Sequence, residues 1–87
     1  MIKVLDFSAD WCSPCKFMEP IFEELTEEYS GKVEFESIDV ESNRSIASKY
    51  QVMSIPTFVV LKEGRETSRR IGAMPKESLK SWIDDNL

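Results

Sequence analysis

Apolar and polar positions follow short, regular periods in the first third of the chain. The run Val4–Phe7 is almost continuously apolar, which is typical of a central strand covered on both faces. After the next turn, apolar residues recur at helical spacing and glutamates occupy the opposite side, so a helix is predicted there. We expect Pro20 to bend this helix and Gly31 to end it. The expected inward positions are Met18, Ile21, Phe22, Leu25 and Tyr29.

The middle of the chain predicts a strand followed by a short helix. Residues 33–40 begin with alternating apolar and acidic side chains, a pattern typical of a half-buried strand. Ser42 or Asn43 can cap the helix that comes next. Its expected inward positions are Ile46, Ala47 and Tyr50.

The last third predicts a hairpin and a final helix. Residues 57–61 are mostly β-branched or aromatic, which favours a strand. A turn at 62–65 leads into a return strand at 66–71, and Pro75 opens a helix. The expected inward positions of that helix are Leu79, Trp82 and Ile83.

The element order is therefore βαβαββα, an α/β fold with a four-stranded mixed sheet and helices on both faces. We expect residues 1–87 to form a single domain. We also expect both strand–helix–strand connections to be right-handed crossovers and the last two strands to be antiparallel. The cysteines come where the first strand ends and the first helix begins, at the edge of an open sheet where sites form.

Charge and composition remove several classes of function. The net charge of −5 argues against nucleic acid, because phosphate binding needs a basic face. We read the Arg69–Arg70 pair as a solvated strand edge. No apolar run approaches the ~18 residues that span a bilayer, so we expect a cytoplasmic protein with no membrane association. Histidine is absent, which excludes an imidazole base or metal ligand.

The chemistry is expected to reside in Cys12 and Cys15, the only two cysteines. Two residues between cysteines fit a redox couple, half of a metal site, or two inert buried thiols. A zinc site needs four ligands, so a second chain would have to complete it. A disulfide across so short a loop would add little stability. We favour the redox couple and expect no metal and no cofactor beyond this disulfide.

The two cysteines should have unequal roles. Cys12 is expected at a helix N-terminus, where backbone donors and the helix dipole stabilise a thiolate. It would attack a substrate disulfide, and Cys15, about one turn further and more covered, would resolve the mixed disulfide. Pro14 would preorganise the first helical turn. Asp6 lies within the apolar first strand, where burial should raise its pKa and suit it to accept the proton of Cys15. An aspartate held only by local backbone donors is the alternative.

The segment Phe7–Lys16, which contains Trp11-Cys12-Ser13-Pro14-Cys15, resembles the active-site segment of thioredoxins. Other landmarks of that family follow in order over nearly the whole chain. They are Pro20 in the first helix, the Ile55-Pro56-Thr57 loop, the turn at Lys62-Glu63-Gly64, and Gly72-Ala73.

The resemblance implies a thiol–disulfide oxidoreductase that reduces protein disulfides and is recharged by a flavin- or ferredoxin-dependent thioredoxin reductase. It assigns the nucleophile to Cys12, the resolving thiol to Cys15 and the acid–base role to Asp6. It also implies a cis bond before Pro56 and a monomeric protein. The substrate groove would be formed by Trp11, Ser13, Pro14, Ile55, Pro56, Gly72 and Ala73.

Four features depart from the family pattern. The chain lacks the strand and helix that usually precede the Val4–Phe7 strand. Ser13 replaces the usual glycine between the cysteines, and this change can shift the reduction potential. Ser8 stands where an aromatic is common, so the wall near the cysteines should be more open. Ser37 occupies a position where a charged residue often accompanies the buried aspartate, which weakens the proton-transfer assignment.

Three other functions remain open from the residues. A glutaredoxin-like protein would use glutathione, although the segments around Cys12 and Pro56 speak against it. A binding module would use the groove without turnover. Two chains could also share zinc or an iron–sulfur cluster through their cysteines.

Overall fold

A computed structural model describes all residues of the chain, 1–87, and shows the predicted order of strands and helices. The hairpin turn has positive φ at Glu63 (53°) and Gly64 (79°), the conformation that matches the twist of antiparallel strands. None of the helices is long and apolar enough to cross a membrane. The elements are β1 (Ile2–Ser8), α1 (Ser13–Glu28), β2 (Val33–Asp39), α2 (Arg44–Lys49), β3 (Thr57–Lys62), β4 (Arg65–Ile71) and α3 (Lys76–Asp85).

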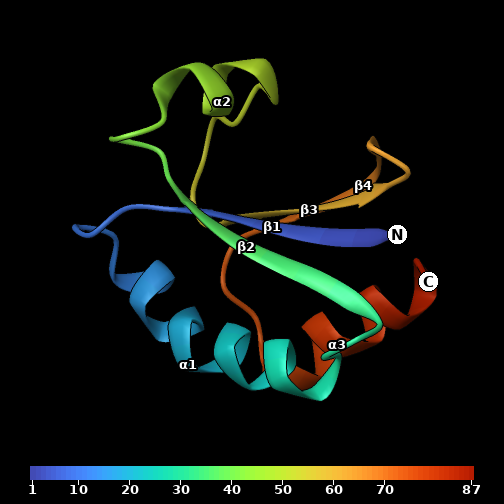
Figure 1. Ribbon diagram of the computed structural model, residues 1–87. Helices are drawn as coiled ribbons and strands as arrows, with labels where there is room; N and C mark the ends of the chain where they lie inside the picture. Colours follow the sequence, from blue (N-terminus) through green and yellow to red (C-terminus); the bar gives the residue numbers. More distant parts are fainter.

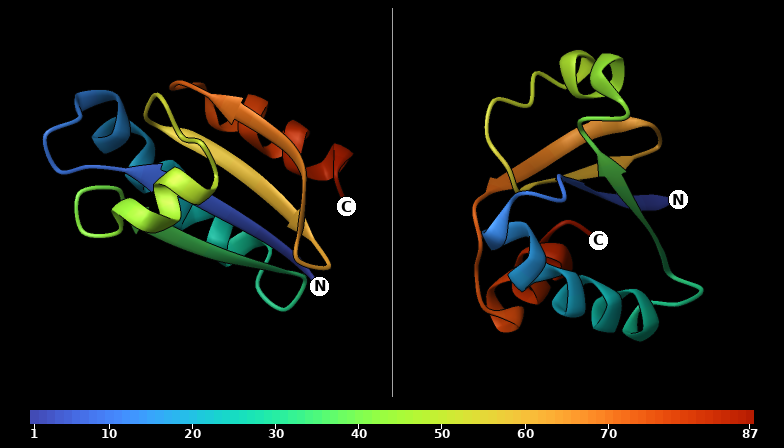
Figure 2. Two further views of the ribbon diagram at one scale, coloured as in Figure 1. Left: turned by 90° about the horizontal axis from the view of Figure 1, so that it is seen from above. Right: turned by 90° about the vertical axis from the view of Figure 1, so that its left-hand side faces the viewer.

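The four strands form one mixed sheet in the order β2-β1-β3-β4. β1 is parallel to β2 and antiparallel to β3, which is antiparallel to β4. Figure 1 shows α1 and α3 on one face of this sheet and α2 on the other, and the right-hand view of Figure 2 shows the same three layers. The predicted α/β sheet with helices on both faces is confirmed.

The prediction of two parallel crossovers is wrong for the second connection. Only β1 and β2 are parallel, and β3 runs in the opposite direction. The reason is the length of α2, whose six residues span about 9 Å, whereas a seven-residue strand spans about 23 Å. The short helix does not return the chain to the far end of the sheet. β3 therefore starts at the edge where β2 ends.

The alternation of side chains along β1 divides the core in two. Val4 belongs to the larger cluster, on the side of α1 and α3. Leu5 and Phe7 belong to the smaller cluster, which Ala47 and Tyr50 cover from the side of α2. Asp6 shares the face of Val4, because residues two apart in a strand point the same way. Asp6 is therefore expected beneath α1.

Several details of the predicted helices change in the structure. The sequence predicts that Ile46 faces inward, but it is 38% exposed. The helix α2 has only six residues and none of them is buried, so it rests loosely on the sheet. Asn43 is the N-cap of α2, yet its side chain donates to the carbonyl of Asp39 instead of capping the helix. At the end of α1 the cap is Tyr29, and Gly31 takes its positive φ of 84° in the turn that follows.

The sheet brings three chain segments to one edge. Phe7 near the end of β1 is paired with Thr57 at the start of β3, and Thr57 is paired with Ile71 at the end of β4. The segments that carry Cys12, Pro56 and Gly72 all continue from these positions. Antiparallel pairing thus gathers the predicted site residues, which are far apart in the sequence.

Candidate active site

Cys12 and Cys15 form a disulfide, with their Cα atoms 5.2 Å apart. Both residues are buried, with exposed fractions of 4% and 2%. Cys15 is therefore the more covered of the two, as expected, but only slightly. Ala9, together with the partly buried Val40 and Ile55, packs against the pair. The disulfide lies just beneath the surface of the sheet edge.

The start of α1 places the sulfur of Cys12 among backbone donors. Cys12 is the N-cap, with extended backbone angles, and its Sγ accepts a hydrogen bond of 3.2 Å from the amide of Cys15. The Cys12 amide donates to the carbonyl of Ala9, closing the turn that leaves β1. A sulfur in this position is stabilised as a thiolate, since unpaired amides and the helix dipole favour negative charge there.

The loop before β3 lies beside the disulfide. The Ile55–Pro56 peptide bond is cis, as the resemblance implied. Thr57 closes this loop, because its hydroxyl donates to the carbonyl of Ser54 at 2.6 Å. Pro56 is fully buried and Ile55 half-buried. Ile55 therefore packs against the cysteines and is also partly exposed at the surface.

The loop after β4 is attached at two points. The Gly72 amide donates to the carbonyl of Pro56 at 2.8 Å, and the Met74 amide donates to the sulfur of Met18 at 3.4 Å. Gly72 has a φ of 98°, a backbone conformation that residues with a side chain rarely adopt. Ala73, between the two attachment points, is exposed.

An apolar pocket of about 190 Å³ opens next to the disulfide. Trp11 (69% exposed) and Met53 (93% exposed) present large apolar side chains around it. We call this pocket the Trp11 groove. It is lined by Trp11, Val40, Val52, Met53, Ser54 and Ile55.

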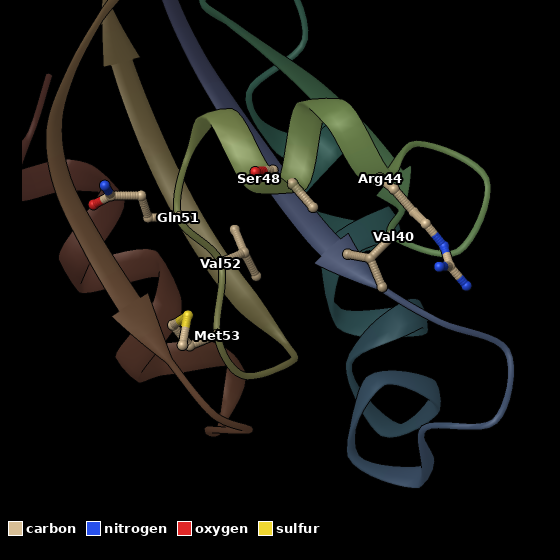
Figure 3. Close-up of a pocket in the computed structure, with 7 residues that line it drawn as sticks. Val40, Arg44, Ser48, Gln51, Val52 and Met53 are labelled. Carbon is tan, nitrogen blue, oxygen red and sulfur yellow. The ribbon is translucent and has the colours of Figure 1, made fainter.

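A second pocket, of about 670 Å³, continues the Trp11 groove along α2. The two pockets share Val40, Val52 and Met53. Figure 3 shows Val40, after β2, on one side of this space and Val52 and Met53, from the loop before β3, on the other. The far end is more polar, with Arg44, Ser48 and Gln51.

The structure brings together only some of the predicted groove residues. Trp11 and Ile55 line one pocket, and Gly72 is bonded to Pro56. Ser13 and Pro14 are exposed in the first turn of α1 and, like Ala73, line no pocket. Sequence reasoning missed Val40, Val52 and Met53 as groove residues. Their apolar character was the available signal, but only the fold shows that they meet.

Arg69 is not the solvated strand-edge residue that the sequence predicts. Its guanidinium binds both oxygens of Glu66 at 2.6 and 2.8 Å. It also donates to the carbonyls of Tyr50 (2.6 Å) and Gln51 (3.5 Å). Arg69 thus ties β4 to the loop that leads into the Trp11 groove.

Asp6 is buried in β1 on the face that α1 covers, with 3% of its surface exposed. Its Oδ1 receives no hydrogen bond from the protein, so the alternative of an aspartate satisfied by local backbone donors does not describe this oxygen. Burial raises the pKa of Asp6 from 3.8 to about 7, and the charge of Glu19 adds to the rise. The carboxyl can therefore exchange a proton near neutral pH.

A cavity of about 240 Å³ connects Asp6 with the surface. Ser8 and Ser37, the two small residues noted in the sequence, line this cavity, so the wall is open there. Ser37 is directly paired with Asp6 across β1 and β2. Three residues of α1 complete the lining, Glu19, Phe22 and Glu23.

The cysteines and carboxylates are arranged for redox and proton chemistry. Both sulfurs are used in the disulfide, and no group of three or more cysteine, aspartate or glutamate side chains is placed to hold a metal ion. A disulfide at a helix N-terminus beside an apolar groove can accept and donate electron pairs through thiol–disulfide exchange. A titratable carboxyl lies in the strand that leads to it.

Comparison with known proteins agrees with this chemistry. The family model described as Thioredoxin matches residues 1–85. A thioredoxin of Staphylococcus epidermidis is 45% identical over 86 residues, which cover 99% of this chain and 83% of that protein. A thioredoxin of Staphylococcus aureus is 44% identical with the same coverage.

A solved structure of a mutant thioredoxin from Halobacterium salinarum NRC-1 is also similar. Its TM-score is 0.89 at 34% identity, and the match covers 97% of this chain and 73% of that one. The similarity thus extends over the sheet, the helices and the disulfide-bearing turn. The chain belongs to the thioredoxin family and is a thiol–disulfide oxidoreductase.

Proposed function

We propose that the protein reduces disulfides of protein substrates with Cys12 as nucleophile, Cys15 as resolving thiol and Asp6 as the proton acceptor. The observation that carries this proposal is the position of Cys12. Its sulfur caps α1 and accepts the amide of Cys15, while an apolar groove opens beside it. A charge-stabilised sulfur next to a peptide-sized apolar surface suits attack on a protein disulfide.

The reaction has two steps. In the reduced protein, the Cys12 thiolate attacks one sulfur of a substrate disulfide, forms a mixed disulfide and releases the other substrate sulfur as a thiolate. Cys15 then passes its proton to the Asp6 carboxylate and attacks Cys12, which forms the Cys12–Cys15 disulfide and releases the second substrate thiolate. Two electrons pass to the substrate, and each released thiolate takes a proton from water.

The groove is proposed to hold an extended substrate segment. Trp11, Ile55 and Met53 would contact its apolar side chains, and backbone groups beside Pro56 would pair with its main chain. Ser13, Pro14, Gly72 and Ala73 would border the same segment. Ser13 and Pro14 follow Cys12 directly in the chain, and Gly72 is bonded to Pro56, which supports this assignment.

The thioredoxin family implies that a reductase restores the dithiol after each cycle. We assign this role to a flavin- or ferredoxin-dependent thioredoxin reductase, with no cofactor in this chain other than its own disulfide. We further propose that residues 1–87 act as one monomeric domain. A disulfide reductant needs a compartment that keeps thiols reduced, which favours the cytoplasm.

The direct test is reduction of insulin in the presence of dithiothreitol. The wild-type protein should accelerate it, and Cys12→Ser should abolish the acceleration. Cys15→Ser should form long-lived mixed disulfides through Cys12, and mass spectrometry of the trapped species would identify substrates. No acceleration by the wild type would contradict the proposal, and turnover only with glutathione and its reductase would indicate the glutaredoxin-like alternative.

A further inference from the structure

The cavity behind Asp6 contains a second carboxylate that the proposed mechanism does not use. Glu19 and Asp6 line the same space of about 240 Å³. Glu19 lies one helical turn after Cys15 on α1, at a spacing of four residues, so the two side chains follow the same line of the helix. Asp6 is buried and Glu19 is exposed, so this space runs from a buried carboxyl to one that reaches the solvent.

The other groups around Asp6 leave Glu19 as the charge that acts on it. β2 contributes Ser37 and β3 contributes Phe58 as direct neighbours in the sheet, and neither is charged. From α1, Phe22, Glu19 and Glu23 face the cavity. Of the two glutamates, Glu19 is the one whose charge raises the pKa of Asp6. No cation faces the cavity to offset it.

We infer that Glu19 is a positioning residue for the second step, which acts across the cavity to make Asp6 a stronger proton acceptor, and that the cavity releases the proton to solvent behind the disulfide. The inference rests on the proposed role of Asp6. Its physical basis is repulsion between two carboxylates in a partly desolvated space, which favours the form in which Asp6 holds a proton.

The cavity and the Trp11 groove have different linings, with no residue in common. A substrate bound in the groove therefore leaves the cavity open. The proton that Cys15 gives to Asp6 can leave through the cavity to water while the substrate still covers the sulfurs. The two routes separate the movement of substrate from the movement of the proton.

The test follows the second step by its pH dependence. Reduced protein is mixed with dithiobis(nitrobenzoate), whose coloured thiolate is released once when Cys12 is modified and once when Cys15 resolves the mixed disulfide. In the wild type, the rate of the second release should rise with a midpoint near pH 7, where Asp6 loses its proton. The first release reports Cys12 and serves as an internal reference.

Glu19→Gln should move this midpoint to lower pH by about half a unit to one unit, as expected for removal of one like charge across a partly hydrated gap. Glu19→Lys should move it further in the same direction. Below the midpoint both variants should be faster than the wild type, and above it slower, because Asp6 is deprotonated earlier but is a weaker base. A merely structural role would not produce this crossing. Glu27→Gln is the matched control, since Glu27 is exposed on the same helix, forms no ion pair and does not line the cavity.

Equal midpoints for Glu19→Gln and Glu27→Gln would overturn the inference. The role of Asp6 is tested separately with Asp6→Asn, which should slow the second release and remove its dependence on pH near 7. A carbon-13 NMR titration of the Asp6 carboxyl in the oxidised protein distinguishes the two failures. If Glu19→Gln shifts that titration but Asp6→Asn leaves the second release unchanged, the carboxylate coupling is supported and the proposed use of Asp6 in catalysis is wrong.

Discussion

The amide of Gly72 donates a hydrogen bond of 2.8 Å to the carbonyl of Pro56. The two residues are far apart in the chain, and this bond joins the loop after β4 to the loop before β3. Gly72 can take part because its φ of 98° suits a residue without a side chain. A change in the loop after β4 should therefore also change the Ile55–Pro56 loop, which lies beside the disulfide.

We therefore expect Gly72→Ala to reduce both stability and substrate binding. An added Cβ at Gly72 would meet no atom within 4 Å, so the cost is backbone strain of about 1–2 kcal/mol. Gly64→Ala is the matched control, since Gly64 has a φ of 79° and equally open surroundings in the distant hairpin. Urea unfolding should show similar losses for both variants. Only Gly72→Ala should lower kcat/KM for insulin reduction, and an equal effect of both on kcat/KM would contradict this account.

Trp11 offers a second test, of the groove itself. It is 69% exposed, so Trp11→Ala should change the free energy of unfolding by less than about 0.5 kcal/mol. Loss of an aromatic contact with the substrate should lower kcat/KM for insulin by about tenfold. The reaction with dithiobis(nitrobenzoate), which needs only the sulfur of Cys12, should be nearly unchanged.

Phe17→Ala is the control for Trp11. Phe17 is 58% exposed on α1 but does not line the Trp11 groove. Its removal takes away a similar aromatic area without touching the proposed contact surface. If both variants lose insulin reduction equally, the groove is not the specific substrate site.

The buried carboxyl of Asp6 predicts that the protein loses stability as the pH rises towards 7. Its pKa is about 7 in the folded protein against an ordinary 3.8, so the folded state holds the proton more tightly than the unfolded state. The associated stability is complete below pH 3.8, declines as the pH increases, and is lost above about pH 7. Asp6→Asn removes this decline, because the amide carries no charge at any of these pH values.

Urea unfolding of the oxidised protein at two pH values checks this prediction. Near pH 4 the wild type and Asp6→Asn should be similar, whereas at about pH 8 the variant should be more stable by on the order of 2–4 kcal/mol. A stability difference that is the same at both pH values would show that Asp6 does not titrate differently in the folded state.

We expect the contacts of Arg69 to hold the loop after α2, which leads into the Trp11 groove, against β4. Removing its bonds to Glu66 and to the carbonyls of Tyr50 and Gln51 should cost about 1–2 kcal/mol of stability in Arg69→Ala. It should also speed amide hydrogen exchange in the loop after α2, at Gln51 and Val52. Arg70→Ala is the control, since Arg70 lies next to Arg69 in β4 but its side chain is exposed and makes no ion pair or hydrogen bond. Faster exchange at these amides in both variants would show that the effect comes from charge rather than from the contacts of Arg69.

Much of the fold could be predicted because its signals are local. The helical spacing of Met18, Phe22 and Leu25 marks one side of α1, and all three are buried. The Glu63–Gly64 turn forms where the sequence predicts a hairpin, since glycine adopts positive φ without a steric clash. Ile46 shows the limit of such signals, because spacing alone does not indicate how much of a short helix the sheet covers.

Part of the candidate site could likewise be predicted from local sequence, and part could not. Cys12, Cys15 and their place at a helix N-terminus follow from one short segment, as does the presence of an acid in the preceding strand. The apolar residues of the Trp11 groove come from the β1–α1 turn, the end of β2 and the loop before β3. Sequence patterns within a few residues do not predict contacts between segments so far apart in the chain.

Residue type and spacing were sufficient to predict the order of strands and helices, the buried sides of α1 and α3, and the position of the redox cysteines. These properties depend on side-chain spacing and backbone preference within a few residues. Only the packing of the whole chain decides that β3 runs antiparallel to β1, that Gly72 is bonded to Pro56, and that Glu19 and Asp6 line one cavity. Those outcomes depend on the path of the chain between distant segments, because contacts between them form only when the whole sheet and its helices pack together.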